Sequence, residues 1–161
     1  MAHGEPGGEP AAELPLADRL ARGVSRRLRD IGYGTLVEFR VGAERRVDVI
    51  GLDQFGRFAI VEIKTSEADF RGDRKWHEYL PFCDRFYFAV PMEFPREILP
   101  VEHGLMTADA FDAAIIRQSQ DLTMNAARRR TQILRFALAA SGRLHYASDP
   151  EASLDRSFWF G

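Results

Sequence analysis

Two acidic residues and a lysine stand near the ends of two neighbouring hydrophobic segments. Asp48 lies within residues 45–52, and Glu62 and Lys64 lie at the end of residues 58–65. Both segments are rich in β-branched residues and a short glycine-containing linker joins them, so we predict an antiparallel hairpin. If the middle of the linker forms the tip, Asp48 lies directly opposite Glu62, with Cβ atoms about 5 Å apart.

Two carboxylates at that distance favour a bound cation. They repel each other by roughly 3 kcal/mol at an effective dielectric constant near 20, so either the flanking Arg46 and Lys64 or a metal ion must compensate them. Carboxylate oxygens suit Mg²⁺ (or Mn²⁺), which keeps water ligands and accepts substrate phosphate oxygens. Lys64 could then hold or activate the attacking water, as metal-assisted phosphodiester hydrolysis requires. We predict Asp48, Glu62 and Lys64 as catalytic residues, and Asp48, Glu62 and the Ile63 backbone carbonyl as metal ligands.

The alternation of residue types along this hairpin predicts two different faces. Even-numbered positions are apolar near the turn and charged beyond it. We therefore expect other segments to bury this face near the turn and to leave it open where the charged residues begin. The odd-numbered positions predict an unbroken apolar face: Val47, Val49, Ala59, Val61 and Ile63.

A third carboxylate precedes the hairpin. Residues 35–41 predict a strand that turns at residues 42–44 into the Asp48 strand, which places Glu38 beside Asp48. Glu38 is therefore a candidate auxiliary ligand for the metal or for water. An ion pair with Arg40 or Arg46 is an equally good interpretation.

The amino-acid sequence around these residues resembles that of a known family. Asp48 followed by Glu62-Ile63-Lys64 resembles the PD-(D/E)xK motif of restriction-endonuclease-like nucleases, with Val47 at the place of the proline. Residues 46–52, 61–66, 69–71 and 83–91 resemble the MmcB-like family of DNA repair proteins, and the resemblance extends over about residues 15–145. It implies an α/β fold with a restriction-endonuclease-like αβββαβ core, whose mixed sheet is flanked by helices, and a role in DNA repair.

The remaining segments supply the other elements of that core and two additions. Residues 16–31 predict an amphipathic helix, residues 75–80 a short helical stretch stopped by Pro81, and residues 85–90 a parallel strand buried on both faces. An added β-hairpin is expected from residues 104–109 and 113–117. A C-terminal helix is expected over residues 125–140, with an apolar face made by Ile133, Leu134, Ala137 and Leu138.

Several polar residues are candidates for contact with DNA. The strongest positive charge is near the C-terminus, where residues 122–148 hold five arginines and no acidic residue. A solvated helix face explains such a run equally well, and in residues 75–80 the alternatives are core positions for Trp76 and Tyr79 and a surface position for His77. The candidates are Arg46, Thr65, Ser66, Lys75, His77, Arg128, Arg129 and Arg130.

Composition favours a single cytoplasmic domain. The net charge of −2 over 161 residues argues against a strongly basic nucleic-acid binder, the single Cys83 excludes an intrachain disulfide, and no apolar run is long enough for a membrane span. We predict a disordered tail over residues 1–14, a nuclease-like domain over 15–147 and a C-terminal tail over 148–161. The apolar end of that tail, residues 157–160, either folds back or contacts a partner.

Four functions compete for the acid pair. They are a magnesium-dependent DNA nuclease or repair factor, a nuclease fold that binds DNA or protein without turnover, an RNA-directed nuclease, and a structural ion network. DNA is the expected partner, other repair proteins are further candidates, and the chain is expected to act as a monomer or homodimer without a membrane.

Overall fold

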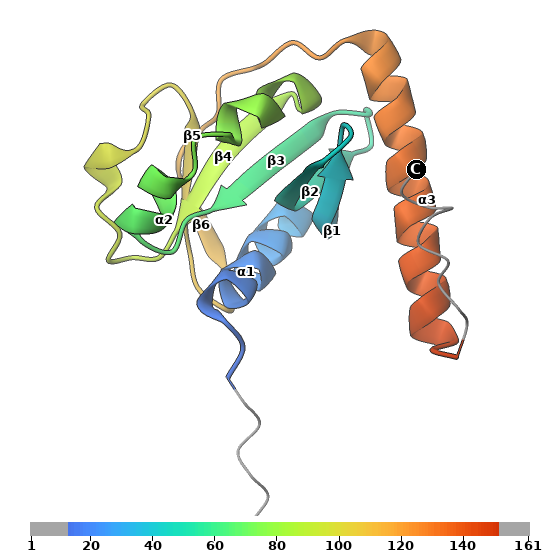
Figure 1. The fold of residues 1–161 in the computed structure, drawn as a ribbon, viewed down its shortest axis with the longest axis horizontal. Helices are drawn as coiled ribbons and strands as arrows, with labels where there is room; N and C mark the ends of the chain where they lie inside the picture. The colour runs from blue at the N-terminus through green and yellow to red at the C-terminus, as the bar shows by residue number, and fades with distance from the viewer. Residues whose placement is uncertain (1–12, 152–161) are drawn as a thin grey trace, which may run out of the picture.

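The fold is a six-stranded mixed sheet with helices on both faces (Figure 1). The structure is a computed structural model that describes residues 13–151, so the predictions for residues 1–12 and 152–161 lie outside it. The helices and strands are, in chain order, α1 (Leu16–Asp30), β1 (Tyr33–Val41), β2 (Arg45–Asp53), β3 (Phe58–Ile63), α2 (Glu67–Gly72), the 3₁₀ helix η1 (Trp76–Phe82), β4 (Arg85–Val90), the 3₁₀ helix η2 (Arg96–Ile98), β5 (Gly104–Ala108), β6 (Ala113–Arg117) and α3 (Ala126–Ser148).

The strands follow one another across the sheet in sequence order. Strands β1, β2 and β3 form an antiparallel meander, β3, β4 and β5 are parallel, and β6 returns antiparallel to β5. The helices α2 and η1 form the crossover from β3 to β4, as a parallel connection requires. This order confirms the predicted αβββαβ core, the added hairpin and the C-terminal helix.

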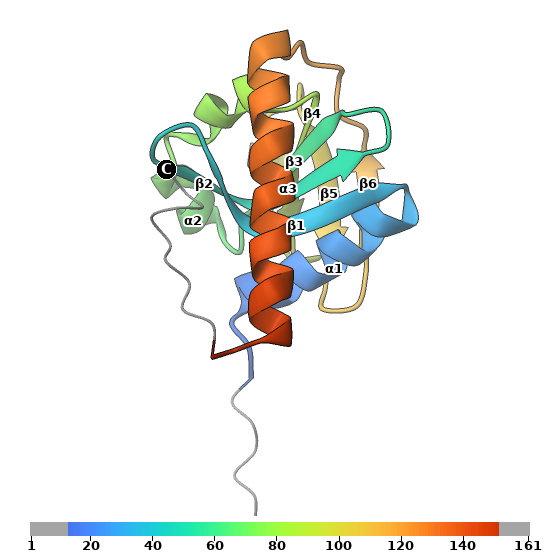
Figure 2. The ribbon, with the colours of Figure 1, turned by 90° about the vertical axis from the view of Figure 1, so that its right-hand side faces the viewer.

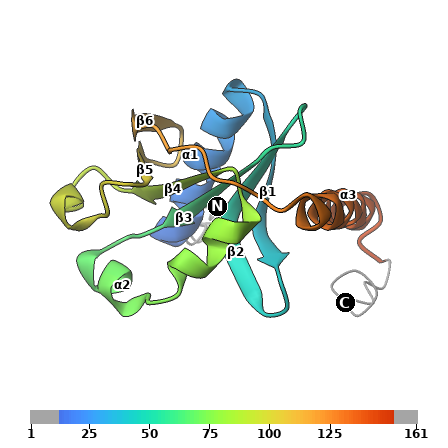
Figure 3. The same ribbon diagram turned by 90° about the horizontal axis from the view of Figure 1, so that it is seen from above.

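Two apolar clusters lie on opposite faces of the sheet. Beneath one face, the stripe of Leu20, Val24 and Leu28 on α1 packs against strand residues that include Val49 and Val61. The other face is covered by η1 and by one side of α3, and Figure 3 shows α1 on one side of the sheet and α2 with η1 on the other. The acid pair belongs to the face that η1 covers.

The predicted unbroken apolar face is wrong at Val47. Val47 packs in the cluster on the α3 side together with Ile50, whereas Val49 belongs to the cluster beneath α1. The alternation of side chains between the two faces of the sheet is therefore interrupted between Val47 and Val49. The pairing register of β1 with β2 is nevertheless the same on both sides of this interruption. The cause lies at Glu38, which the register places opposite Asp48 and whose φ of 49° is in the left-handed region that non-glycine residues rarely adopt.

Helix α3 differs from its prediction in its length and in the side of the helix that is buried. It continues to Ser148, and its buried side is formed by Gln132, Phe136 and Ala139 instead of the expected apolar residues. Of those, Ile133 is partly buried, but Leu134 is 61% exposed and Leu138 is 48% exposed. The helix lies along the β1 edge of the sheet and its C-terminal half extends past it (Figure 2), so the few sheet residues it meets decide which side is buried.

A smaller correction concerns one connection. Pro81 does not stop the short helix, because η1 continues through it to Phe82. The polar stretch after Lys64 forms α2. No helix in residues 13–151 is long and apolar enough to cross a membrane.

Candidate functional site

Asp48 and Glu62 lie where the β2–β3 ladder opens. The last ladder pair is Val49 with Val61, in the register that we predicted. Beyond it, side chains replace the backbone partners: the Ile63 N–H donates to Asp48 Oδ2 at 2.8 Å, and the Asp48 N–H donates to Glu62 Oε1 at 3.2 Å. The two carboxylates are thus held beside each other by the strand backbones, which need these acceptors because an unpaired buried N–H is costly.

The two carboxylates are largely removed from solvent, and this raises their pKa values. Glu62 is 4% exposed and Asp48 is half-buried. Burial, followed by the charge of Asp48, raises the pKa of Glu62 to about 8. Burial also raises the pKa of Asp48, and the hydrogen bond from the Ile63 N–H opposes this rise. Near neutral pH the pair therefore holds a proton, which a bound cation would replace.

Lys64 lies one pleat beyond Glu62 and faces a different acid. Its Nζ donates to Asp73 Oδ2 at 2.7 Å, with the two side chains 6% and 21% exposed. Burial lowers the pKa of Lys64, but the hydrogen bond and charge of Asp73, together with Glu62, outweigh it and the net shift is upward. Lys64 is consequently an ammonium group that cannot take a proton from water at neutral pH.

Sequence reasoning missed Asp73. The pairing with Lys64 lowers the pKa of Asp73 against the opposing effect of burial, and the Lys75 N–H also donates to its carboxylate. The segment between Lys64 and Asp73 contains other acids, so composition does not single out the partner. The partner is set by α2, which carries the chain back beside the end of β3.

Thr65 and Ser66, predicted to contact DNA, cap helix α2. Ser66 Oγ accepts from the Asp69 N–H at 3.1 Å, and Asp69 Oδ2 accepts from the Thr65 N–H at 3.0 Å. A serine followed three residues later by an acid, just before a helix, is a capping signal that could have been recognised in the sequence. Ser66 is exposed and Thr65 is half-buried, so both still border the site.

Helix η1 covers the site with aromatic residues. Trp76 packs on Phe86 and Phe88, with ring centroids 5.8 and 5.1 Å apart, and Tyr79 is buried with its hydroxyl donating to the Arg46 carbonyl. Burial and then the charge of Glu62 raise the pKa of Tyr79 to about 12, so it remains a neutral donor. Trp76 and Tyr79 are core residues, as the alternative interpretation held, while His77 and Lys75 are exposed.

Glu38 is not drawn into the acid pair. Its side chain is 64% exposed and its carboxylate lies 3.8 Å from Arg46, which was the alternative interpretation of this residue. The same ion pair engages Arg46, which we predicted as a DNA contact. The left-handed backbone at Glu38 explains the outcome, because it breaks the alternation on which the prediction depended.

The arginine run of α3 divides into different roles. Arg129 donates to both carboxylate oxygens of Asp84, at 2.7 and 2.6 Å, and to the Gly56 carbonyl at 2.9 Å. It holds α3 to the body of the protein, and its predicted contact with DNA stays a prediction. Arg128 lies over the Phe82 ring, 4.8 Å from its centroid, and Arg130 is exposed.

The donor set at the acid pair fits a hard divalent cation with few protein ligands. Within residues 13–151 no group of three or more histidine, cysteine, aspartate or glutamate side chains could hold a metal. Asp48 and Glu62 supply two carboxylates, and the carbonyl of Ile63 faces the same neighbouring strand as its N–H. Magnesium fills its remaining positions with water and phosphate oxygens, so two carboxylates are a sufficient set.

Comparison with known proteins identifies one family. The family model of the DNA repair protein MmcB-like matches residues 12–151. A protein of unknown function from Silicibacter pomeroyi is 46% identical, with a TM-score of 0.85, over 88% of this chain and 97% of that chain. A repair endonuclease from Pyrococcus abyssi gives a TM-score of 0.41 at 18% identity, over 65% of this chain and 50% of that chain, and this similarity is too low to bear on function. No curated protein matches.

Proposed function

Because the chain belongs to the MmcB-like family of DNA repair proteins, we propose that it hydrolyses DNA phosphodiester bonds at the acid pair with Mg²⁺ or Mn²⁺. The observation that carries the proposal is the placement of Asp48 and Glu62 side by side, buried, with raised pKa values. Such an arrangement costs stability, and a cation that binds both carboxylates removes that cost.

Each residue has a defined part in this mechanism. Asp48, Glu62 and the Ile63 carbonyl hold the metal ion, which when bound polarises the phosphate and lowers the pKa of a water ligand. Lys64 acts as a fixed positive charge that orients water and the phosphate oxygens, since its raised pKa excludes it as a base. The Asp73 carboxylate positions the Lys64 ammonium at 2.7 Å.

The ion pair between Lys64 and Asp73 also favours a second candidate function. In that case the nuclease fold binds DNA or a repair partner without turnover, because the lysine charge is already neutralised within the fold. The two candidates make the same prediction for metal binding and different predictions for cleavage.

One set of measurements tests both candidates. Metal binding is followed by thermal shift with Mg²⁺ and Mn²⁺ for the wild type and Asp48→Asn. Cleavage is then assayed on end-labelled nicked, flapped, linear and single-stranded DNA and on the matching RNA, with Lys64→Ala as the catalytic variant. We expect metal-dependent stabilisation and DNA cleavage in the wild type alone.

The other outcomes are equally informative. Metal binding and DNA binding without cleavage of any substrate would favour the function without turnover, and preferential cleavage of RNA would change the substrate. Cleavage unaltered in Lys64→Ala would assign the activity to another site or to a contaminant. Absence of any metal-induced stabilisation of the wild type would contradict the metal site itself.

A further inference from the structure

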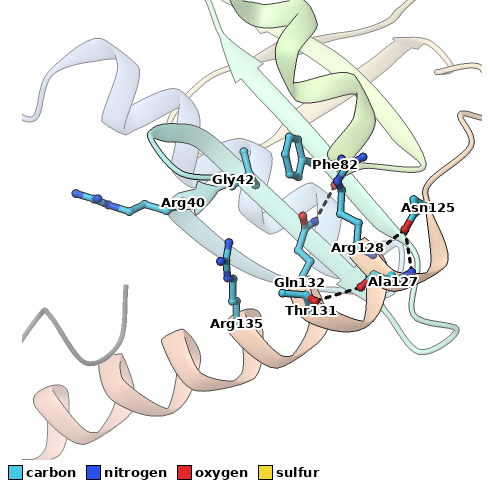
Figure 4. A pocket seen from close by; sticks show the side chains of 10 residues that line it. Arg40, Gly42, Phe82, Asn125, Ala127, Arg128, Thr131, Gln132 and Arg135 are labelled. Atoms are coloured by element: carbon cyan, nitrogen blue, oxygen red, sulfur yellow. Dashed lines mark hydrogen bonds between the residues drawn. The ribbon is translucent and has the colours of Figure 1, made fainter. Parts of the chain in front are cut away.

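A second candidate site lies at the far end of η1 from Lys64 and Asp73. It is a pocket of about 450 Å³ between the β1–β2 turn, the end of η1 and the first turns of α3 (Figure 4). Since η1 has seven residues and a 3₁₀ helix rises about 2 Å per residue, roughly 14 Å of helix separates the two sites. We name this the arginine pocket, after the three arginines that line it: Arg40, Arg128 and Arg135.

The arginine pocket draws its positive charge toward a ligand from Arg128 and Arg135. None of the ten described residues that line it is an aspartate or a glutamate. In Figure 4, Arg135 points from α3 toward the turn that contains Gly42, and Arg128 stands beside the Phe82 ring. Both arginines are exposed, and Arg128 also donates to the Pro81 carbonyl at 3.3 Å, which holds its guanidinium group at the pocket.

The walls of the pocket are fixed by contacts of their own. Gln132, which is buried, donates to the Phe82 carbonyl at 2.7 Å and ties α3 to the end of η1. Gly42 has a φ of 60°, and a Cβ there would come within 3.2 Å of the Phe82 ring, so the turn lies closer to the ring than a residue with a side chain would ordinarily allow. The arginines therefore project from a rigid frame.

The chemistry of the pocket selects an oxyanion. Guanidinium groups present planar, paired donors that match phosphate oxygens. The first free amides of α3 contribute little, because the Asn125 side chain already accepts from the Ala127 and Arg128 N–H groups. A stacked base is also disfavoured, since the Arg128 guanidinium already lies over the Phe82 ring and Gly42 approaches the tip of that ring.

We propose that the arginine pocket binds a phosphate of a DNA strand that also reaches the acid pair. The proposal rests on the proposed function for the source of the phosphate, and a free phosphate or nucleotide would share the same chemistry. With one phosphate at each end of η1, the strand would be held in a fixed orientation before reaction. Contacts to phosphates position a nucleic acid without reading its sequence.

The test compares two exposed arginines on opposite faces of the sheet. Arg135→Ala removes a pocket residue, whereas Arg22→Ala removes an equal charge from α1, which packs on the other face of the sheet and does not line the pocket. DNA affinity is measured with EDTA present, by fluorescence anisotropy on an unphosphorylated linear duplex at several salt concentrations. We expect Arg135→Ala to weaken binding about tenfold and to reduce the salt-dependence slope by about 1, with Arg22→Ala changing affinity less than about twofold.

A second arm distinguishes the source of the phosphate. Thermal shift with inorganic phosphate and with a mononucleotide is measured on the wild type and on Arg135→Ala. Stabilisation of the wild type that Arg135→Ala abolishes, together with unchanged DNA affinity of Arg135→Ala, would assign the pocket to a small anion and overturn the DNA assignment. Equal losses of DNA affinity in Arg22→Ala and Arg135→Ala would overturn it as well, by showing a diffuse charge effect.

Failure of this proposal can be told apart from failure of the proposed function. With EDTA present, the measurement does not depend on a metal at Asp48 and Glu62, or on cleavage. If the wild type binds DNA and Arg135→Ala binds it equally well, the arginine pocket fails and the acid site is untouched. If metal binds at Asp48 but the wild type does not bind DNA, both the DNA substrate and the pocket assignment fail, while the metal site stands.

Discussion

The acid site and the arginine pocket differ in how far their charged groups are buried and in how those charges are compensated. In the acid site, Glu62 and Lys64 are 4% and 5% exposed, and the charges are reduced by a shared proton and by the ion pair with Asp73. In the arginine pocket, Arg128 and Arg135 are exposed and no lining residue is acidic. A desolvated site can hold a metal tightly and do chemistry, whereas an open cationic site attracts and orients a polyanion.

The difference also explains why the net charge is a poor guide to partners here. A formal charge of −2 is summed over the whole chain and does not record where the charges lie. Glu62 is buried, so solvent and long-range fields reach it poorly, while Arg128 and Arg135 are exposed. We therefore expect the acid site to respond to pH and metal, and the arginine pocket to respond to salt.

The largest effect is expected from Asp48→Asn. The asparagine oxygen can still accept from the Ile63 N–H, so the open end of the ladder is kept, but the paired negative charge is lost. We expect metal-induced stabilisation to disappear and metal-dependent cleavage to fall a thousandfold or more. Thermal shift and single-turnover assays measure this, and an Asp48→Asn protein that keeps full metal binding would remove Asp48 from the site.

The next largest effect concerns pH and metal-free stability. The pKa of Glu62 is raised from 4.5 to about 8, so the folded state binds more protons than the unfolded state between these values. The contribution of Glu62 to stability is therefore fully present below about pH 4.5 and is lost as pH rises through 8, by about 1.4 kcal/mol per pKa unit or a few kcal/mol in total. Glu62→Gln should flatten this dependence in urea titrations with EDTA.

The proton held by the acid pair should also make the affinity for Mg²⁺ depend on pH. A metal that needs both carboxylates ionised must displace the proton of the pair, so its affinity should rise with pH up to about 8. Calorimetry in buffers of different ionisation enthalpy reports the released proton. A metal affinity that is constant from pH 6 to 8 would show that Glu62 is not a ligand.

A smaller effect separates neighbouring arginines of α3. Arg129→Ala should lower the free energy of unfolding by about 2 kcal/mol, because it leaves the partly buried Asp84 without its two guanidinium bonds. Arg130→Ala should change it by less than about 0.5 kcal/mol. Denaturant titration of the two variants checks this, and equal stabilities would mean that the bidentate pair contributes nothing.

The smallest effect is expected from Glu38→Gln. The ion pair of Glu38 with Arg46 is exposed, and such pairs contribute about 0–1 kcal/mol. We expect stability to change by less than about 0.5 kcal/mol, with metal affinity unchanged. A clear loss of metal affinity would instead bring Glu38 into the site as the auxiliary ligand first predicted.

Much of the acid site could be predicted because it depends on local rules. The tip of the β2–β3 turn and the period of two along strands are enough to set the register that brings Asp48 opposite Glu62. The same kind of reasoning predicted that β4 is parallel to its neighbour. These local rules failed at Val47, because the left-handed backbone of Glu38 interrupts the alternation, and the side chains beyond it point to the opposite face of the sheet from the one predicted.

The helix faces could not be predicted to the same degree. The periodicity of α3 suits more than one apolar side, and the side that is buried contains Gln132 and Phe136. The choice depends on the contact with Phe39 and Phe58 from the sheet and on the hydrogen bond from Gln132 to the Phe82 carbonyl. These partners are distant in sequence, so the pattern within the helix cannot reveal them.

The amino-acid sequence by itself determined the strands, the register of β2 with β3 and the meeting of Asp48 with Glu62, because each follows from alternation and from one short turn. Only the tertiary structure decided that Lys64 faces Asp73, that Arg129 is used inside the fold, and that Arg128 and Arg135 line a pocket. The physical reason is that a helix can dock in several phases and a long side chain can choose among several partners. The packing of separate segments removes those choices.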